Sequence, residues 1–347
     1  MTDVLNGAFE TIGFDALDGR RLMLHRLQLR SGVNELGPVL MIAGTSVRAG
    51  IFSPPLPRTL PRMLSDEGYD VWLLDWRASI DLPATDFTLD DAAVYDHPAA
   101  VATICAVTKR DRIKAIVHCQ GSTSFMISIV SGLLPQVSTV VSNSVALHPH
   151  VPKLMWLKMP LAMAALRPFV TELNAQWGLH PPGAVPKLLN FAMRAVHHEC
   201  NNSVCKMSSF MYGTGFPTLW RHENLTDATH EWLKGEVAQA PMSFFLQIQE
   251  SIKAGELVSS DRHRDVLPAT FTSKPPQTDA RFAFVTGERN ATFLPSGMAK
   301  TFEFFDAHEP GRHSFQVLPG YGHLDVFLGK NAATEVFPMI IDELGED

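Results

Sequence analysis

The 347-residue chain lacks several features that would assign it to a particular class of protein. Four cysteines are too few for a disulfide framework in a chain of this length. The net charge of −7 comes without blocks of like charge, which argues against a nucleic-acid-binding surface. No uncharged apolar run reaches about 18 residues, so no membrane-spanning helix is predicted. Residues Met1 to Leu5 lack the basic and apolar regions of a signal peptide. We therefore expect a cytoplasmic protein with reduced thiols.

Apolar runs of strand length alternate with helical patterns in the first part of the chain. Two alternating runs around Asp18-Gly19 predict a hairpin. The runs that follow predict further strands, and they are "PVLMIAGTS", "YDVWLLDWR", "KAIVHCQG" and "VSTVVSNSVAL". This alternation is typical of an α/β fold, with a mostly parallel sheet flanked by helices.

The alternation stops at about residue 148 and resumes at about residue 277. The intervening segment is helical and rich in methionine and aromatic residues. After it come the strand pattern "ARFAFVTGERN", a helical stretch from Pro295 to about His308, and the strand pattern "HSFQVLPGYGH". One helix over "LDVFLGKNAATEVFPMIIDEL" is expected to close the chain. We predict a core formed by 1–147 and 277–347, interrupted by a helical cap at 148–276.

The stretch "AIVHCQGSTS" places a cysteine at a predicted turn between a strand and a helix. Such a turn is a nucleophile elbow, usually written G-x-S-x-G. Cys119 occupies the nucleophile position, Gly121 is the second small residue, and Val117 replaces the first glycine. The end of the following helix is expected to lower the pKa of the thiol and favour the thiolate. A buried, unreactive cysteine is the alternative.

A base for this nucleophile is expected in the loop after the last strand. His323, in "LPGYGHLDVF", lies there. His118 is a rival, but because it adjoins Cys119 in sequence we expect its side chain to point elsewhere.

The third member of a triad is expected about three residues after the glycine that ends the preceding strand. Counting from Gly287 gives Asn290. A cysteine is acidic enough that an amide, which only orients the histidine, can serve as in Cys-His-Asn sites. Glu288 and Asp325 remain alternatives for this role.

The motifs "HCQGS", "GERN" and "GYGHLD" resemble those of the α/β-hydrolase superfamily over essentially the whole chain. They look more specifically like the hydrolase-like domain that accompanies some cholesterol-oxidase-type flavin oxidoreductases. A cysteine in the lipase box is also similar to polyhydroxyalkanoate synthases and dienelactone hydrolases. The resemblance implies the α/β-hydrolase fold with an inserted cap. No G-x-G-x-x-G is present, so we expect no dinucleotide, and no other cofactor is indicated.

An oxyanion hole is expected from two backbone N–H groups. One belongs to Gln120, after the nucleophile, and the other to Thr45 or Ser46, after an earlier strand. Arg48 is either a contact for an acidic group of the substrate or a solvated surface residue. The cap residues that we expect to face the substrate are Phe210, Met211 and Tyr212.

The stretch "HHECNNSVC" brings five potential metal ligands close together in sequence, and they are His197, His198, Glu199, Cys200 and Cys205. A zinc site needs a second pair of ligands, and none is evident, so the sequence predicts no metal site. A bond between Cys200 and Cys205 would require an oxidising compartment.

These residues predict an acyl-group hydrolase that forms a Cys acyl-enzyme with an apolar ester or thioester. The partner is then a small acyl ester or thioester, carrier-bound acyl groups included. An acyltransferase that passes the acyl group to an alcohol, amine or thiol is the alternative. A non-catalytic module of the same fold that binds a ligand or partner is a second alternative, and a homodimer is left open.

Overall fold

The computed structural model describes residues 8–28 and 35–346, so the expectation for Met1 to Leu5 lies outside the described residues. Within the described part, eight strands form one sheet in the order β1-β2-β4-β3-β5-β6-β9-β10. Strand β2 is antiparallel to β1 and to β4, and the other neighbours are parallel. Both the hairpin and the mostly parallel sheet are therefore confirmed. The strands are β1 (Phe9–Asp15), β2 (Arg21–Leu27), β3 (Pro38–Ile42), β4 (Asp70–Asp75), β5 (Ile113–His118), β6 (Val137–Asn143), β9 (Arg281–Gly287) and β10 (Ser314–Leu318).

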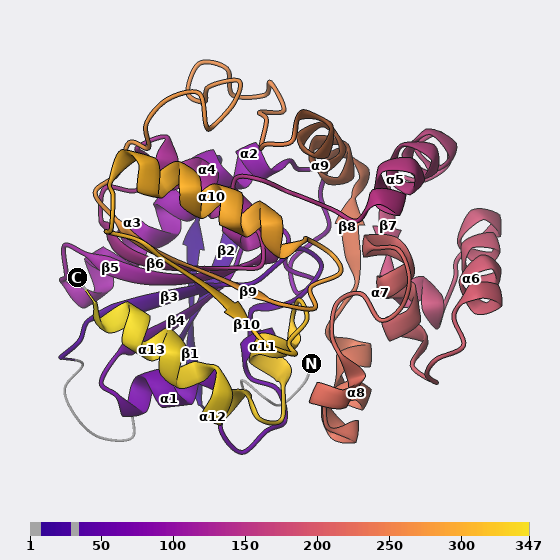
Figure 1. The fold of residues 1–347 in the computed structure, drawn as a ribbon, viewed down its shortest axis with the longest axis horizontal. Helices are drawn as coiled ribbons and strands as arrows, with labels where there is room; N and C mark the ends of the chain where they lie inside the picture. The colour runs from indigo at the N-terminus through magenta and orange to yellow at the C-terminus, as the bar shows by residue number, and fades with distance from the viewer. Residues whose placement is uncertain (1–7, 29–34, 347) are drawn as a thin grey trace.

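Helices cover both faces of the sheet (Figure 1). One face packs against α2 (Leu89–Asp91), α3 (His97–Thr108), α4 (Cys119–Val130) and α10 (Pro295–His308). The other packs against α1 (Leu60–Asp66), α11 (Asp325–Leu328), α12 (Ala332–Glu335) and α13 (Phe337–Gly345). Successive residues of a strand point to opposite faces. In β3, Leu40 and Ile42 join the first core, while Val39 and Met41 join the second.

The segment between β6 and β9 places its helices at one end of the sheet, and the chain after them passes back over the sheet layer, where Ser260, Arg262 and His263 bond to α2 (Figure 1). Its helices are α5 (Lys153–Leu166), α6 (Ala184–Val196), α7 (Ser203–Tyr212), α8 (Asp227–Trp232) and α9 (Met242–Ala254). A two-stranded ribbon, β7 (Glu172–Asn174) with β8 (Gln239–Pro241), was not expected, because three-residue strands are too short to show a period. We refer to residues 148–276 as the cap.

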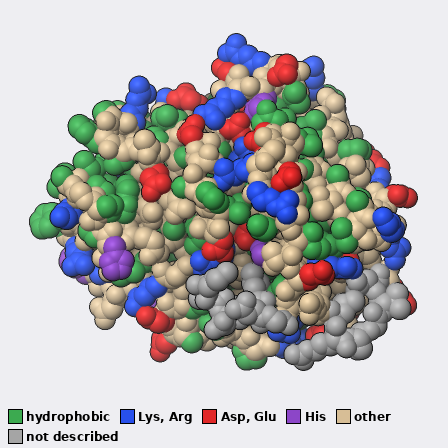
Figure 2. All heavy atoms as spheres, turned by 180° about the vertical axis from the view of Figure 1, so that it is seen from behind, with side chains coloured by type: hydrophobic (Ala, Val, Ile, Leu, Met, Phe, Trp, Pro, Cys, Tyr) green, Lys and Arg blue, Asp and Glu red, His purple; other side chains and the backbone are tan. Residues whose placement is uncertain are grey.

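The surface of the cap differs from that of the sheet layer. Large apolar side chains on α5 and α6 are exposed, among them Leu157, Leu161, Leu188 and Phe191. From behind, hydrophobic side chains lie over the left of the molecule, where the cap is, and acidic and basic side chains are interspersed (Figure 2). No described helix is long and apolar enough to cross a lipid bilayer.

The single helix expected at the C-terminal end is wrong. The structure has three short helices there, α11, α12 and α13. The first ends at Gly329, where the chain turns extended. The last begins with Pro338 in its first turn, a position that proline favours because its missing N–H has no helical partner there. Gly329 and Pro338 thus divide a segment in which the spacing of apolar residues, taken alone, predicts one continuous helix.

The residues singled out in the sequence meet at one edge of the sheet. Thr45 follows β3, Cys119 follows β5, Asn290 follows β9 and His323 follows β10. In parallel sheets the carboxyl ends of the strands lie at the same edge, where ligands bind in open α/β folds.

The closeness of β3 to the start of α4 predicts that Gly121 is required for stability. A Cβ atom on Gly121 would lie 2.2 Å from the carbonyl oxygen of Ala43. We expect Gly121→Ala to lower the free energy of unfolding by about 1–3 kcal/mol or more, as overpacking does. The control Gly235→Ala adds a methyl group with no atom within 4 Å. Denaturant midpoints test this, and equal midpoints for both variants would contradict it.

Candidate active site

Cys119 lies in the turn that joins β5 to α4, and its backbone is left-handed, with a φ of 54°. Such a φ is unusual for a residue with a side chain and is found mostly where a site requires it. The turn presses against the end of β3, since a Cβ atom on Gly44 would lie 2.9 Å from the Cβ of Cys119. The strained turn therefore holds the thiol at the carboxyl edge of the sheet, as in a nucleophile elbow.

Asn290 fixes the ring of His323. The Oδ1 atom of Asn290 accepts the backbone N–H groups of Thr292 and Phe293, each at 3.1 Å, and lies 3.2 Å from Nδ1 of His323. Two N–H donors determine which end of the amide is oxygen, so Nδ1 of His323 must carry its proton. The lone pair is then on Nε2, which is buried without a hydrogen-bond partner among the described residues. His323 is thus held as the tautomer that can accept a proton.

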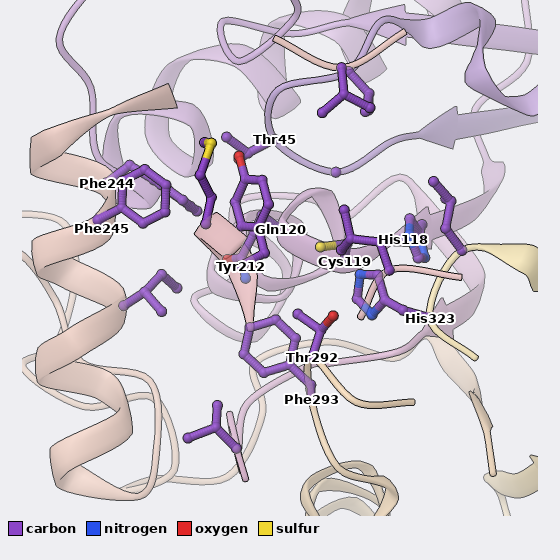
Figure 3. A pocket seen from close by; sticks show the side chains of 18 of the residues that line it. Thr45, His118, Cys119, Gln120, Tyr212, Phe244, Phe245, Thr292, Phe293 and His323 are labelled. Atoms are coloured by element: carbon purple, nitrogen blue, oxygen red, sulfur yellow. The ribbon is translucent and has the colours of Figure 1, made fainter. Parts of the chain in front are cut away.

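The thiol lies within reach of two imidazoles. Sγ of Cys119 and one ring nitrogen each of His118 and His323 lie within 4.8 Å of one another. Figure 3 shows both rings beside the cysteine. The expectation that His118 points elsewhere is wrong: as the last residue of β5 it turns to the α11 face, where its ring packs 4.8 Å from that of His323. Its Nδ1 is 2.7 Å from Oδ1 of Asn143, an orientation that the sequence did not reveal.

The two acidic alternatives for the third residue have other partners. Glu288 is on the surface, where it accepts the backbone N–H of Gly320. Asp325 is buried and accepts the N–H of Gly322 and the side-chain amide of Asn224. Asp325 therefore shapes the loop that carries His323, and Asn290 makes the contact to the ring.

Burial favours the neutral forms of both Cys119 and His323. Cys119 keeps some exposure to the cavity, but protein atoms surround its sulfur, and this burial raises the pKa of the thiol to about 12 despite the N–H of Gln120. Burial, with a smaller effect of His118, holds the pKa of His323 well below its ordinary value. The predicted lowering of the thiol pKa by the helix end is wrong, because desolvation outweighs it. The resting pair is a thiol and an imidazole.

The structure distinguishes between Thr45 and Ser46, the two candidates for the second oxyanion donor. Gln120 and Thr45 line the cavity beside Cys119 (Figure 3), and the hydroxyl of Thr45 is buried without a partner among the described residues. Ser46 donates its backbone N–H to Ala78 and pairs its hydroxyl with that of Tyr212 at 2.6 Å. Between the two alternatives the geometry thus favours Thr45.

The cavity above Cys119 has a volume of about 70 Å³ and walls that are almost entirely apolar. The cap supplies Met155 and Met159 from α5, Met211 and Tyr212 from α7, and Phe244 and Phe245 from α9. Two of the expected substrate residues, Met211 and Tyr212, are therefore in its wall. Thr292 and Phe293, which the sequence did not single out, close the side next to His323 (Figure 3).

Arg48 and Phe210 do not line this cavity. The guanidinium of Arg48 forms ion pairs with Asp81 and Glu236, both at 2.8 Å. It ties the loop after β3 to the cap, and it is neither a substrate contact nor a solvated surface residue. Phe210 faces a second cavity of about 210 Å³, which is lined only by residues of the cap.

No protein-family model matches the chain. It is 22% identical to human lipase member K over 82% of this chain and 73% of that protein. It is 30% identical to a probable lipase of Schizosaccharomyces pombe over 37% of this chain, a segment that spans only 30% of that relative's length.

Solved structures resemble nearly the whole chain. They include DcsB in complex with its substrate analogue (TM-score 0.60, 15% identity, 97% of this chain and 99% of that one). The α/β-hydrolase GrgF from Penicillium sp. sh18 (TM-score 0.58, 14% identity) covers 97% of both chains. A monoacylglycerol lipase of Paleococcus ferrophilus (TM-score 0.56, 14% identity) matches 93% of this chain and 99% of that one. The chain has the α/β-hydrolase fold, as predicted.

A neutral thiol in the resting site predicts a distinctive pH dependence for its alkylation. With a pKa of about 12, only about one Cys119 in 10⁴ is a thiolate at pH 8. Labelling by iodoacetamide, followed by peptide mass spectrometry, should accelerate about tenfold per pH unit from pH 7 to 10. Cys119→Ser identifies the labelled peptide. A rate that is already constant between pH 6 and 8 would instead indicate a thiolate–imidazolium pair.

Proposed function

We propose that the protein is an acyl-group hydrolase that acts on apolar esters or thioesters through an acyl-enzyme on Cys119. The observation that carries the proposal is the left-handed turn at Cys119, with a ring nitrogen of His323 within 4.8 Å of the thiol sulfur and the Nε2 of that ring unpartnered among the described residues. The similarity to lipases supports ester hydrolysis in general. The cysteine nucleophile and the Cys-His-Asn triad rest on the geometry alone.

The first half of the proposed reaction forms a thioester. Nε2 of His323 takes the proton of the thiol as Sγ attacks the substrate carbonyl. The backbone N–H groups of Gln120 and Thr45 donate hydrogen bonds to the oxyanion that develops. The imidazolium then gives its proton to the leaving alcohol or thiol, and the carbon–oxygen or carbon–sulfur bond breaks.

The second half releases the acyl group. A water molecule attacks the thioester carbonyl while His323 takes its proton, and the sulfur leaves with that proton restored. An alcohol, amine or thiol in place of water makes the same site an acyltransferase, and this alternative remains because sulfur acyl-enzymes react readily with other nucleophiles. The closeness of His323 to Cys119 argues against a non-catalytic module. The resemblance to hydrolase-like domains of cholesterol-oxidase-type proteins stays an expectation.

The cavities indicate the kind of acyl group. The 210 Å³ cavity adjoins the one above Cys119, and the two share Met155, Met159, Met211 and Phe245 as walls. Methionine side chains are flexible and adapt to irregular apolar ligands. An acyl chain that displaces these methionines would extend from Cys119 into the second cavity. Each methylene buried there contributes up to about 0.8 kcal/mol.

The acyl-enzyme itself is the first test. Intact-mass spectrometry after incubation with short and long p-nitrophenyl esters and acyl thioesters should find one acyl group, on Cys119. Cys119→Ala should show no adduct and lose about four orders of magnitude or more of kcat. Cys105→Ala, a cysteine on α3 away from the cavity, is the matched control. Turnover of Cys119→Ala near that of the control would overturn the proposal. Adducts that persist in water but disappear with an added alcohol or thiol indicate the transferase.

Filling the second cavity with a larger side chain should shorten the acyl chain that the enzyme prefers. Ala162 on α5 lines that cavity, and Ala164 on the same helix is exposed. We expect Ala162→Phe to lower the ratio of kcat/KM for long over short p-nitrophenyl esters by about tenfold or more, equivalent to about two lost methylenes. Ala164→Phe should leave the ratio unchanged. If both variants keep the wild-type ratio, the acyl chain does not enter this cavity.

A further inference from the structure

A second cluster of reactive side chains lies in the cap, away from the candidate active site. It consists of Cys200, Cys205, His222 and His230, and their ligand atoms all lie within 4.8 Å of one another. None of these residues lines the cavity above Cys119. The sequence placed His197, His198 and Glu199 beside the cysteine pair, but none of these three belongs to the cluster. It missed His222 and His230, which come later and show no metal-site spacing to the cysteines.

The four side chains come from separate short elements. Cys200 lies in the loop after α6, and Cys205 in the first turn of α7. His222 begins a 3-10 helix, η4 (His222–Asn224), and His230 lies in α8. Bringing four such elements to one point requires specific contacts.

Asn202 supplies several of these contacts. Its side-chain oxygen accepts the N–H groups of Val204 and Cys205, which caps α7. Its amide nitrogen donates to the carbonyl of His230 at 2.6 Å. Asn202 is nearly fully buried, and its contacts are to backbone groups. It therefore holds the turn that carries the cysteines against α8 without using any of the four ligand atoms.

The distances approach those of a tetrahedral zinc site. Zinc binds sulfur at about 2.3 Å and histidine nitrogen at about 2.0–2.1 Å, so neighbouring ligand atoms lie roughly 3.3–3.8 Å apart. Sγ of Cys205 and Nε2 of His222 are already 3.3 Å apart. The remaining separations, none above 4.8 Å, would close by about 1.5 Å or less. Nε2 of His230 is buried without a hydrogen-bond partner among the described residues.

We propose that Cys200, Cys205, His222 and His230 bind one Zn²⁺ in a tetrahedral site that stabilises the cap. Both thiols lose their protons to solvent as the two zinc–sulfur bonds form, and both imidazoles bind through a nitrogen lone pair. Four protein ligands leave no open position, which is typical of structural rather than catalytic zinc.

The site would fix one wall of the catalytic cavity. Helix α7 carries Cys205 at its start and Met211 and Tyr212 at its end. Next to His222, the side chain of Asn224 donates to Asp325, which holds the loop of His323. A metal that joins these elements would therefore order the cap over Cys119 without touching the substrate.

Metal analysis of the full-length protein, purified without chelators, tests the site. We expect about one zinc per chain, with all four thiols present by mass. Cys200→Ser with His230→Asn should reduce bound zinc at least tenfold, whereas Cys119→Ser should retain it. Chelator should lower the Tm of the wild-type protein, and added Zn²⁺ should restore it.

Cobalt binding tests the site in the wild-type protein, so the result does not depend on whether the variants are stable. Wild-type protein loaded with Co²⁺ should show a thiolate charge-transfer band and the intense visible bands of tetrahedral cobalt, and Cys105→Ser should keep both. A mass lower by two hydrogens with no zinc, which indicates a Cys200–Cys205 disulfide, would overturn the proposal. So would four free thiols that bind no Zn²⁺ or Co²⁺ on addition. Zinc lost in Cys119→Ser but kept in the double variant would assign the metal to the Cys119 site and overturn it as well.

Discussion

The arrangement of the site depends on one constraint, the left-handed turn at Cys119. A φ of 54° costs a residue with a side chain of order 1–3 kcal/mol, and the surrounding structure must supply it. It does so because Gly44 and Gly121 let the end of β3 approach the turn more closely than any Cβ atom would allow. The carboxyl ends of β9 and β10 then bring Asn290 and His323 to the same edge. The geometry of the site is thus a consequence of the strand order and of glycine at positions 44 and 121.

The electrostatics of the site follow from its burial. A carboxylate beside His323 would favour the imidazolium, but the Asn290 amide only orients the ring and adds no charge. With thiol and imidazole both neutral at rest, the proposed mechanism creates charge only during attack, when proton transfer and carbon–sulfur bond formation occur together. The apolar walls that disfavour the resting ion pair also strengthen every hydrogen bond to the oxyanion, since the local dielectric constant is low. A cysteine suits this arrangement better than a serine, because its proton is the easier one to remove.

The sequence predicted what local patterns encode. Strand periods gave the sheet, and a glycine at a strand end located Asn290 by counting. Properties that depend on three-dimensional surroundings were not accessible. The helix end at Cys119 suggested a thiolate, but burial of the sulfur raises the pKa of the thiol instead, and burial depends on residues that are distant in sequence. The orientation of His118 depends on Asn143 of the neighbouring strand, and Arg48 is engaged by Glu236, far away in sequence. The helix expected at the C-terminal end failed because apolar spacing was given more weight than Gly329 and Pro338.

The cap shows how one insertion can serve two purposes with different residue types. The face of the cap over Cys119 is lined by methionine and phenylalanine, and in the proposed function the flexible methionines adapt to the acyl chain. A wall of flexible side chains needs rigid elements behind it if substrates are to be selected by length. The elements α7, η4 and α8 are short, and small units of this kind are commonly stabilised by a metal or a disulfide in addition to their apolar contacts. The Cys200–His230 cluster lies where these three elements meet. A metal bound there would stabilise the elements behind the adaptable wall of the catalytic cavity.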